Sequence, residues 1–258
     1  MKMMNVLKKT SNILIGIAIL VAIWQAIIIA GKYEQSLLPP PGKVLSGIVT
    51  LIQDGTLFTH LKVSLVRFAA GYLAAAILAV GLGLVLSRLR RVWDIVDPIV
   101  QVLRPVSPIA WSPFIVLWFG IGDAPAIVII FLAAFFPVLL STIAGVRKVD
   151  PTYLKLAQNL EIRRGKLLTK IIFPAAFPSI ANGLHIAIGT SWIFLVSGEM
   201  VGAQSGLGYL IVDARNQLRL DLVLAGIILI GLCGLLLDRG IRLFERWIER
   251  QWGMVPKP

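Results

Sequence analysis

Charged residues and cysteine are both scarce in this sequence. Only 15% of its 258 residues are charged, while 57% are hydrophobic. A soluble domain carries about 25% charged residues, which its water-facing surface needs. The single cysteine, Cys233, excludes a small secreted domain held by disulfides, and the hydrophobic excess excludes a disordered chain. Long stretches without any charge, such as 13–30 and 223–237, instead predict helices that cross a membrane.

Groups that carry out catalysis or bind metals are also missing from the sequence. The two histidines, His60 and His185, lie far apart and have no metal-ligand spacing. Residues 163–166 read Arg-Arg-Gly-Lys, like the end of a phosphate-binding loop, but Leu160 replaces the first glycine and Leu167 follows the lysine. We therefore expect neither an enzyme nor a resident cofactor. Any uphill transport must draw its energy from a partner or an ion gradient.

Basic residues outnumber acidic ones, 25 to 13, which gives a net charge of +12. They do not form the continuous basic surface that nucleic-acid binding requires. Instead, 18 of the 25 lie before the first apolar run, at 88–91, at 147–170 and in the tail from Arg239. Short basic loops stay in the cytoplasm, so this distribution predicts that both termini are cytoplasmic and that no nucleic acid is bound.

The apolar runs predict an all-α membrane protein with a single transmembrane domain over 1–258. Runs of about 20 residues match the thickness of the hydrocarbon layer. The third run contains Pro98, Pro105, Pro108 and Pro113, so we expect its helix to be interrupted. The glycines Gly81, Gly83, Gly183 and Gly189 are predicted to allow close helix contacts. The six predicted spans cover about 11–30, 65–86, 95–119, 126–146, 174–196 and 221–237.

The loop between the fourth and fifth predicted spans is the longest and most basic of the cytoplasmic loops. Asp150-Pro151 is typical of a helix start, since an acidic cap precedes a proline in the first turn. Leu154, Ala157 and Leu160 follow at roughly helical spacing, which predicts an amphipathic helix over about 151–170. Such a helix either lies along the membrane surface or docks into a groove of another protein.

Two ionisable residues fall at or near membrane depth and are candidates for function. Arg104 lies among prolines, where irregular backbone must line a cavity or be buried in protein; alternatively, its side chain extends to the cytoplasmic interface. Glu199 ends the fifth span. We expect it to pair with Arg215 or Lys62 at an outer gate, or to cap the following turn.

Other residues near these positions are predicted to line a translocation pathway or its gate. Tryptophans at span ends are commonly interfacial anchors, so anchoring and packing remain alternatives for them. The candidates are Ser107, Trp111, Trp118, Trp192 and Ser197, together with Arg104 and Glu199.

Several motifs in a fixed order make the chain resemble the permease subunit of a bacterial ABC importer, in the branch that serves nitrate, sulfonates and taurine. The resemblance is nearly full length and rests on the combination of motifs. These are Leu38-Pro39-Pro40-Pro41, Arg104-Pro105-Val106-Ser107-Pro108-Ile109-Ala110-Trp111, Leu117-Trp118-Phe119-Gly120-Ile121-Gly122, Phe135-Phe136-Pro137, Gly145-Val146-Arg147, Phe173-Pro174-Ala175-Ala176-Phe177-Pro178 and Gly206-Leu207-Gly208-Tyr209.

The resemblance implies a type I importer fold in the bacterial inner membrane, with six spans in each of two permease copies. It further implies two cytoplasmic ATP-binding subunits, which hold the ATP and magnesium, and an external solute-binding protein. The lipid of the surrounding membrane is also an expected partner. Importers of riboflavin or a pyrimidine precursor have similar permeases. A secondary transporter or channel is the other class considered, although the spans contain almost no paired acids or proton relay.

The resemblance also implies that the loop at 147–172 is a coupling helix, which docks on the ATP-binding subunit. The family motif reads Glu-Ala-Ala, three residues, glycine, and a proline thirteen residues later. Ala157 and Pro174 match it, whereas Lys155, Leu156 and Glu161 replace its Glu, Ala and Gly. A glutamate adopts positive φ only at a cost, so we expect the turn at Gly165 instead. The implied coupling residues are Pro151, Leu154, Lys155, Leu156, Ala157, Leu160, Glu161, Gly165 and Pro174.

Overall fold

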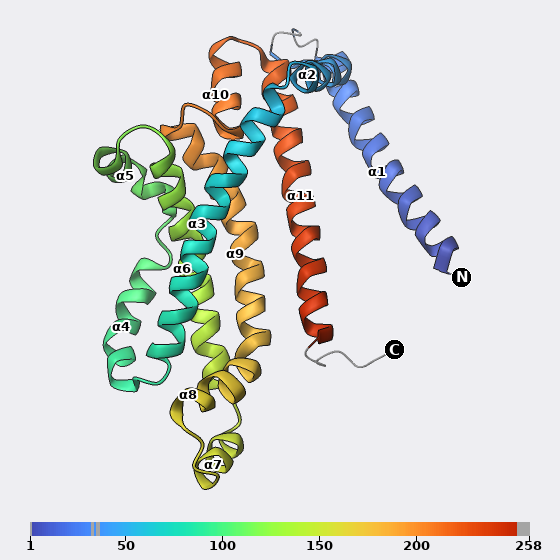
Figure 1. Ribbon diagram of the computed structural model, residues 1–258. Helices are drawn as coiled ribbons and strands as arrows, with labels where there is room; N and C mark the ends of the chain where they lie inside the picture. Colours follow the sequence, from blue (N-terminus) through green and yellow to red (C-terminus); the bar gives the residue numbers. More distant parts are fainter. Residues whose placement is uncertain (1, 32–33, 35–36, 252–258) are drawn as a thin grey trace. The chain divides into compact units, whose positions relative to one another are not determined.

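The structure is a computed structural model that describes residues 2–31, 34 and 37–251. All regular elements in this part of the chain are helices, shown in Figure 1. The chain divides into two compact units. The first comprises Met1–Thr59 and Leu210–Ile230, and the second comprises His60–Tyr209 and Gly231–Pro258.

The first unit contains the amphipathic helix α2 (Pro41–Gln53), which begins with proline in its first turn. Val44, Gly47 and Leu51 form the buried face of α2. An added Cβ at Gly47 would lie 3.2 Å from Leu222, so the absence of a side chain lets α2 pack tightly on the first turns of helix α11. The unit also contains α1 (Lys2–Gly31), the start of α3 (Thr56–Leu86), most of α10 (Leu207–Asn216) and the start of α11 (Leu220–Gln251).

The second unit is built around α6 (Asp123–Arg147) and α9 (Phe173–Gly202), which lie side by side along their length (Figure 1). Its remaining elements are most of α3, α4 (Arg90–Leu103), the 3₁₀ turn η1 (Pro108–Trp111), α5 (Ser112–Phe119), α7 (Pro151–Asn159), α8 (Arg164–Leu167), the π-helical turn η2 (Leu168–Ile172) and the second part of α11.

Small residues allow the helices of the second unit to approach closely. An added Cβ at Gly83 of α3 would lie 2.7 Å from Thr142 of α6, and one at Gly183 of α9 would overlap Ser141. The predicted close contacts at these two glycines are confirmed. The prediction is wrong for Gly81 and Gly189, where an added Cβ would meet nothing within 4 Å. The core contains Ala75, Ala79, Trp93, Val100, Ala134, Val138, Leu139, Ile143 and Ala187.

Fewer helices than the six predicted spans are individually long and apolar enough to cross a membrane. Within the described residues, four pass this test: Thr56–Leu86, Asp123–Arg147, Gly165–Gly202 and Leu220–Leu243. The first predicted span lies in α1, whose apolar part Ile15–Gly31 is shorter than these four. Several apolar helices in the described chain nevertheless agree with an all-α, multi-pass membrane protein.

The third predicted span, 95–119, is not one straight helix. Arg90–Leu103 and Pro108–Phe119 meet at an angle of 86°. Proline lacks a backbone N–H and blocks the carbonyl one turn earlier, so Pro105 and Pro108 prevent α4 from continuing. Pro98, by contrast, is accommodated inside α4. The bend creates a recess beside α6 and α9, described below.

Candidate functional site

A buried ion pair joins α3 to α9. Nη1 of Arg67 lies 2.9 Å from Oε1 of Glu199, and the two side chains are 2% and 0% exposed. Moving two charges out of water costs several kcal/mol per ion, and their mutual attraction offsets this only when further hydrogen bonds satisfy both groups. Both side chains have such bonds.

The carboxylate of Glu199 has two further donors. The hydroxyl of Ser64, on α3, lies 2.7 and 2.9 Å from its two oxygens. The backbone N–H of Gly208, in the first turn of α10, donates to Oε2 at 2.9 Å. Glu199 therefore links three helices, and its negative charge lies near the N-terminus of α10, where the helix dipole favours an anion.

The guanidinium of Arg67 has partners on two more segments. It donates to the carbonyl oxygen of Ser205 at 2.6 Å and to the Ser205 hydroxyl at 2.8 Å. Its Nε donates to Asp123, the first residue of α6, at 2.8 Å. The side chain of Asp123 is 69% exposed, so this edge of the cluster reaches the surface. We call Ser64, Arg67, Asp123, Glu199 and Ser205 the Arg67 network.

The Gly206-Leu207-Gly208-Tyr209 motif provides the space that Glu199 occupies. Gly206 has φ +103°, and a Cβ there would overlap the Glu199 carboxylate. A Cβ at Gly208 would collide with the carbonyl oxygen of Val196. The N–H of Gly206 also donates to Nδ1 of His60 at 3.0 Å. Only glycine at these two positions lets the backbone pass this close to the carboxylate.

The structure corrects the predicted partner of Glu199. The carboxylate pairs with Arg67 instead of Arg215 or Lys62, whereas the predicted capping of the following turn is confirmed by its bond to Gly208. The sequence did contain a signal for Arg67, because it is a lone arginine inside the apolar run 65–86. Which acid it meets depends on how α3 packs on α9.

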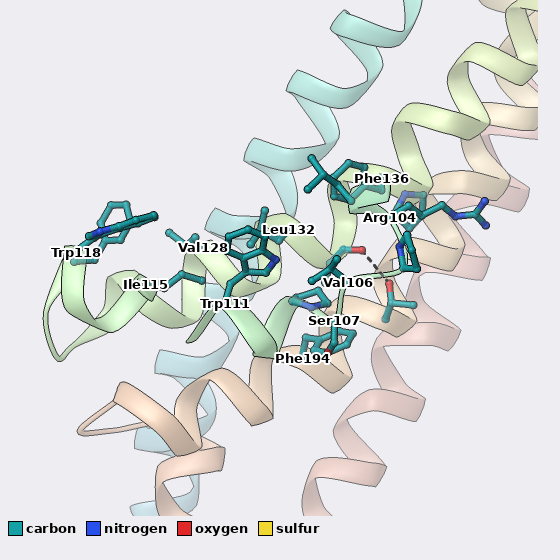
Figure 2. Close-up of a pocket in the computed structure, with 17 residues that line it drawn as sticks. Arg104, Val106, Ser107, Trp111, Ile115, Trp118, Val128, Leu132, Phe136 and Phe194 are labelled. Carbon is teal, nitrogen blue, oxygen red and sulfur yellow. Dashed lines mark hydrogen bonds between the residues drawn. The ribbon is translucent and has the colours of Figure 1, made fainter. Parts of the chain in front are cut away.

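A second candidate site is a cavity of about 630 Å³ beside the bend between α4 and α5. Figure 2 shows that its labelled residues come from the bend and from α5, α6 and α9. Most of its wall is aliphatic or aromatic. Its lining comprises Leu103, Arg104, Pro105, Val106, Ser107, Pro108, Trp111, Ile115, Trp118, Phe119, Val128, Leu132, Ala133, Phe136, Pro137, Thr190 and Phe194.

Four predicted pathway residues meet at this cavity: Arg104, Ser107, Trp111 and Trp118. Arg104 lies at its rim, and Figure 2 shows its guanidinium projecting away from the labelled aromatic side chains. The hydroxyl of Thr190 donates its hydrogen to the carbonyl of Ala187 at 3.0 Å, so in this arrangement it does not serve as a donor to an anion. The cavity therefore combines an apolar interior with one cation at its edge.

The other two predicted pathway residues of this group do not line the cavity. Trp192 is buried against the edge of Phe68, at 5.7 Å between ring centroids, and lies beside Gly234 of α11. Ser197 lies with its hydroxyl 3.4 Å from the carbonyl of Ile193, on its own helix. For Trp192 the packing alternative is the one that agrees with the structure.

The predicted coupling helix is divided into short elements. α7 ends at Asn159, and Glu161 then adopts φ +50° while the N–H of Ile162 donates to the carbonyl of Ala157 at 3.0 Å. This is the arrangement in which glycine normally ends a helix. The expectation of a turn at Gly165 is wrong, because Gly165 lies inside α8. Glu161 adopts the glycine-type conformation itself, at the position where the family motif has glycine.

The apolar residues of α7 lie on two sides of the helix. Ala157 is 2% exposed and packs inside the chain, whereas Leu156 and Leu160 are 54% and 64% exposed. Tyr153, three residues before Leu156, is exposed as well. The side chain of Leu154 lies outside the described residues. The exposed apolar face of α7 is therefore formed by Tyr153 and Leu156 and is extended by Leu160, which directly follows the helix.

The start of α7 is fixed as expected. Oδ1 of Asp150 accepts a hydrogen bond from the N–H of Thr152 at 2.7 Å, and Pro151 occupies the first helical position. This bond holds the pKa of Asp150 below its ordinary value. A depressed carboxyl pKa means that the cap stabilises α7 above the ordinary pKa and is lost as the pH falls below it.

Comparison with known proteins decides the family. Residues 55–250 match the family described as the inner membrane component of a binding-protein-dependent transport system. The chain belongs to this family. It is thus a permease subunit of an ABC importer and a component of the bacterial inner membrane. The match covers the Arg67 network, the cavity and the loop at 147–172, which we call the predicted coupling loop.

Curated permeases are identical to this chain at more than a third of the aligned residues. The taurine transport system permease protein TauC of Escherichia coli is 36% identical over 93% of this chain and 89% of its own length. The putative aliphatic sulfonates transport permease protein SsuC of Bacillus subtilis is 38% identical, over 89% and 83%. The nitrate import permease protein NrtB of a Synechocystis strain is 35% identical, over 90% and 86%.

A solved structure supports the permease fold. A chain of the MetNI methionine ABC transporter, in an inward-facing conformation, superposes with a TM-score of 0.51. The likeness covers 72% of this chain and 94% of that chain, at 20% identity. At this identity the comparison bears on the fold alone.

Proposed function

We propose that this permease forms the translocation pathway for a small organic anion of the sulfonate class, delivered by an external solute-binding protein. The observation that carries the proposal is the similarity to permeases whose names specify taurine, aliphatic sulfonates and nitrate. All three substrates contain an anionic, oxygen-rich group. In taurine and the aliphatic sulfonates this group is attached to a carbon chain, whereas nitrate has no carbon.

The character of the cavity favours a sulfonate over nitrate. Its wall is formed mainly by side chains such as Trp111, Trp118 and Phe194. A small inorganic anion gains nothing from an apolar wall and loses its hydration there, whereas the carbon chain of a sulfonate benefits from contact with it. A cavity of about 630 Å³ also has ample room for an organic molecule.

Arg104 is the residue we assign to attracting the anion. It lies at the rim of the cavity, where a fixed cation raises the local concentration of anions. Because the guanidinium points away from the aromatic interior, it meets the substrate at the entrance and does not hold it inside (Figure 2). Transport requires release as well as entry, so weak attraction suits this role.

The proposed assembly contains two copies of this chain, two ATP-binding subunits and one solute-binding protein. The partner subunits hold ATP and magnesium. If α1 and the bent pair each cross the membrane once, the chain has six crossings and both termini face the cytoplasm. The distribution of basic residues supports this orientation, since Arg88, Arg90 and Arg91 after α3 and the basic loop after α6 then lie on the cytoplasmic side.

The exposed face of α7 is the proposed docking surface for the ATP-binding subunit. Tyr153, Leu156 and Leu160 form an apolar stripe on a loop that also carries many cations. An exposed stripe of this kind suits a hydrophobic groove on a partner. Ala157 instead supports the stripe from inside the loop.

Replacing Leu156 by Arg tests the docking surface. A charge buried in the partner's groove costs several kcal/mol, so we expect normal membrane insertion but loss of the ATP-binding subunit during purification. Asn159→Ala is the matched control, because it changes an exposed residue of the same helix and leaves the stripe intact. Co-purification of the ATP-binding subunit with the Leu156→Arg variant would place docking elsewhere.

Uptake by proteoliposomes containing the assembled complex tests the substrate. We expect ATP-dependent uptake of ethanesulfonate, weak competition by nitrate, and a lower rate for Arg104→Gln at unchanged assembly. Arg104→Lys keeps the charge but loses the planar fork, and should retain part of the rate. Equal uptake of riboflavin by wild type and Arg104→Gln would favour a neutral substrate. Uptake that needs no ATP would indicate a secondary transporter.

A further inference from the structure

Two residues other than glycine have positive φ in the described chain, and one of them is a leucine whose side chain is largely exposed. They are Glu161, in the coupling loop, and Leu218, with φ +57°. Leu218 lies between α10 and α11 and is 84% exposed. A large apolar side chain in this conformation needs an explanation, because both its backbone and its exposure are unfavourable.

Hydrogen bonds at the end of α10 hold Leu218 in this conformation. Its N–H donates to the carbonyl of Arg215 at 3.0 Å, and the N–H of Arg219 donates to that of Ala214 at 2.9 Å. This pair of bonds defines a helix end at which glycine is strongly favoured. Glycine would form the same turn without strain, so the turn itself does not require the leucine side chain.

A polar pocket of about 420 Å³ lies beside Leu218, within the first unit of the chain. Its cations are Lys43, at the start of α2, and Arg219, which forms hydrogen bonds of 3.0 and 2.7 Å to the carboxylate of Asp221. Arg215 is exposed one turn earlier. The surface therefore retains an excess of positive charge. The pocket is lined by Pro39, Lys43, Ser46, Leu218, Arg219, Leu220 and Asp221.

The pocket and the exposed apolar residues of α2 lie on different sides of that helix. Leu45, Val49 and Ile52 are exposed and lie together on one side of the helix, as expected for contact with lipid. Lys43 and Ser46, which line the pocket, lie on a different side. Leu218 thus lies beside a polar surface, so contact with lipid does not explain why its side chain is exposed.

We propose that Leu218 and the adjoining pocket form a docking point for the external solute-binding protein. An acidic side chain of that protein enters the pocket between Lys43 and Arg219, while an apolar depression covers Leu218. Burial of the leucine side chain offsets the backbone strain, and the charges set the orientation of the partner. The inference rests on the proposed function, since the Leu218 turn faces outward only if the coupling loop, at the other end of α9, is cytoplasmic.

The test uses the assembled complex in phosphatidylcholine nanodiscs. ATP hydrolysis is measured against the concentration of the solute-binding protein whose coding region adjoins that of this chain. Leu218→Gly relieves the strain and removes only the side chain, so the variant should fold. We expect unchanged basal hydrolysis and about a tenfold higher concentration of binding protein for half-maximal stimulation. Leu37→Gly, which removes an exposed leucine that does not line the pocket, should leave this concentration unchanged.

Lys43→Gln tests the charged part of the surface. It should weaken stimulation most at low salt and flatten the salt dependence, because salt screens the attraction between the charges. Unchanged stimulation of both the Leu218→Gly and Lys43→Gln variants would overturn the proposal. So would a defect of Leu218→Gly confined to basal hydrolysis in phosphatidylglycerol nanodiscs, which would identify a lipid contact. If the wild-type complex does not respond to the binding protein at all, the proposed function itself fails.

Discussion

At the scale of single residues, Arg67 connects segments that are far apart in the sequence. From α3 it binds Asp123 at the start of α6, Glu199 on α9 and Ser205 beyond it. Apolar helix surfaces pack well in several neighbouring positions, whereas hydrogen bonds between charged groups require one geometry. The Arg67 network therefore fixes the positions of three helices relative to one another.

Removing Arg67 should destabilise the permease strongly. In Arg67→Met the Glu199 carboxylate stays buried without its counter-ion, which costs about 3–5 kcal/mol. Glu199→Gln alone should also destabilise. The double variant should lose less than the sum of the two, since neither charge then remains unpaired. Thermal unfolding of the purified variants in detergent measures this coupling, and strictly additive losses would contradict it.

Glu161 offers a substitution that should stabilise the coupling loop. A residue with a Cβ in the left-handed region costs about 1 kcal/mol, part of which glycine recovers. We expect Glu161→Gly to slow amide hydrogen exchange around Ile162 by a few fold, while Glu161→Val accelerates it. Faster exchange in the Glu161→Gly variant would mean that the glutamate side chain itself stabilises the turn.

At the scale of the elements, α6 and α9 owe their close approach to small residues at specific positions. Gly183 lies against Ser141, and a Cβ added at Gly145 would lie only 2.7 Å from the Cβ of Ser179. In a lipid environment, where the surrounding tails are as apolar as the helices, such contacts and buried hydrogen bonds drive helix association. The two helices can thus form the rigid centre of the second unit.

Two glycines in α9 allow a test of whether its packing against α6 matters for stability, because only one of them lies at a close contact. Gly183→Leu should push α9 away from α6 and lower the melting temperature of the purified protein markedly, since overpacking typically costs about 1–3 kcal/mol or more. Gly189→Leu should have little effect, because an added Cβ there meets no atom within 4 Å and the helix surface is open at this position. Equal melting temperatures of the two variants would show that α6 and α9 tolerate separation.

The elements also show why some features follow from sequence and others do not. The helix at 126–146 was predictable to within a few residues, since a continuous apolar run specifies it locally. The partner of Glu199 was not, because it depends on which face of α3 meets α9. The conformation of Glu161 was mispredicted for a related reason: the local cost of positive φ is offset by hydrogen bonds and by the packing of Ala157.

At the scale of the whole molecule, the proposed topology makes a direct prediction about accessibility. With Cys233 replaced by Ala, a cysteine at Leu218 should react with a membrane-impermeant maleimide added outside intact cells. A cysteine at Tyr153 or Ser11 should react only after the membrane is opened, because positively charged loops remain in the cytoplasm. Labelling of the Tyr153→Cys variant in intact cells would reverse the orientation.

The length of α9 has a mechanical consequence for the permease. The helix begins at Phe173, directly after the coupling loop, and carries Glu199 near its other end. At 1.5 Å per residue these positions are roughly 40 Å apart, so a tilt of about 5° at the base displaces the far end by roughly 3.5 Å. That displacement exceeds the length of the hydrogen bond between Arg67 and Glu199. A rigid α9 would therefore convert a small rotation at the proposed coupling loop into a movement large enough to break that bond.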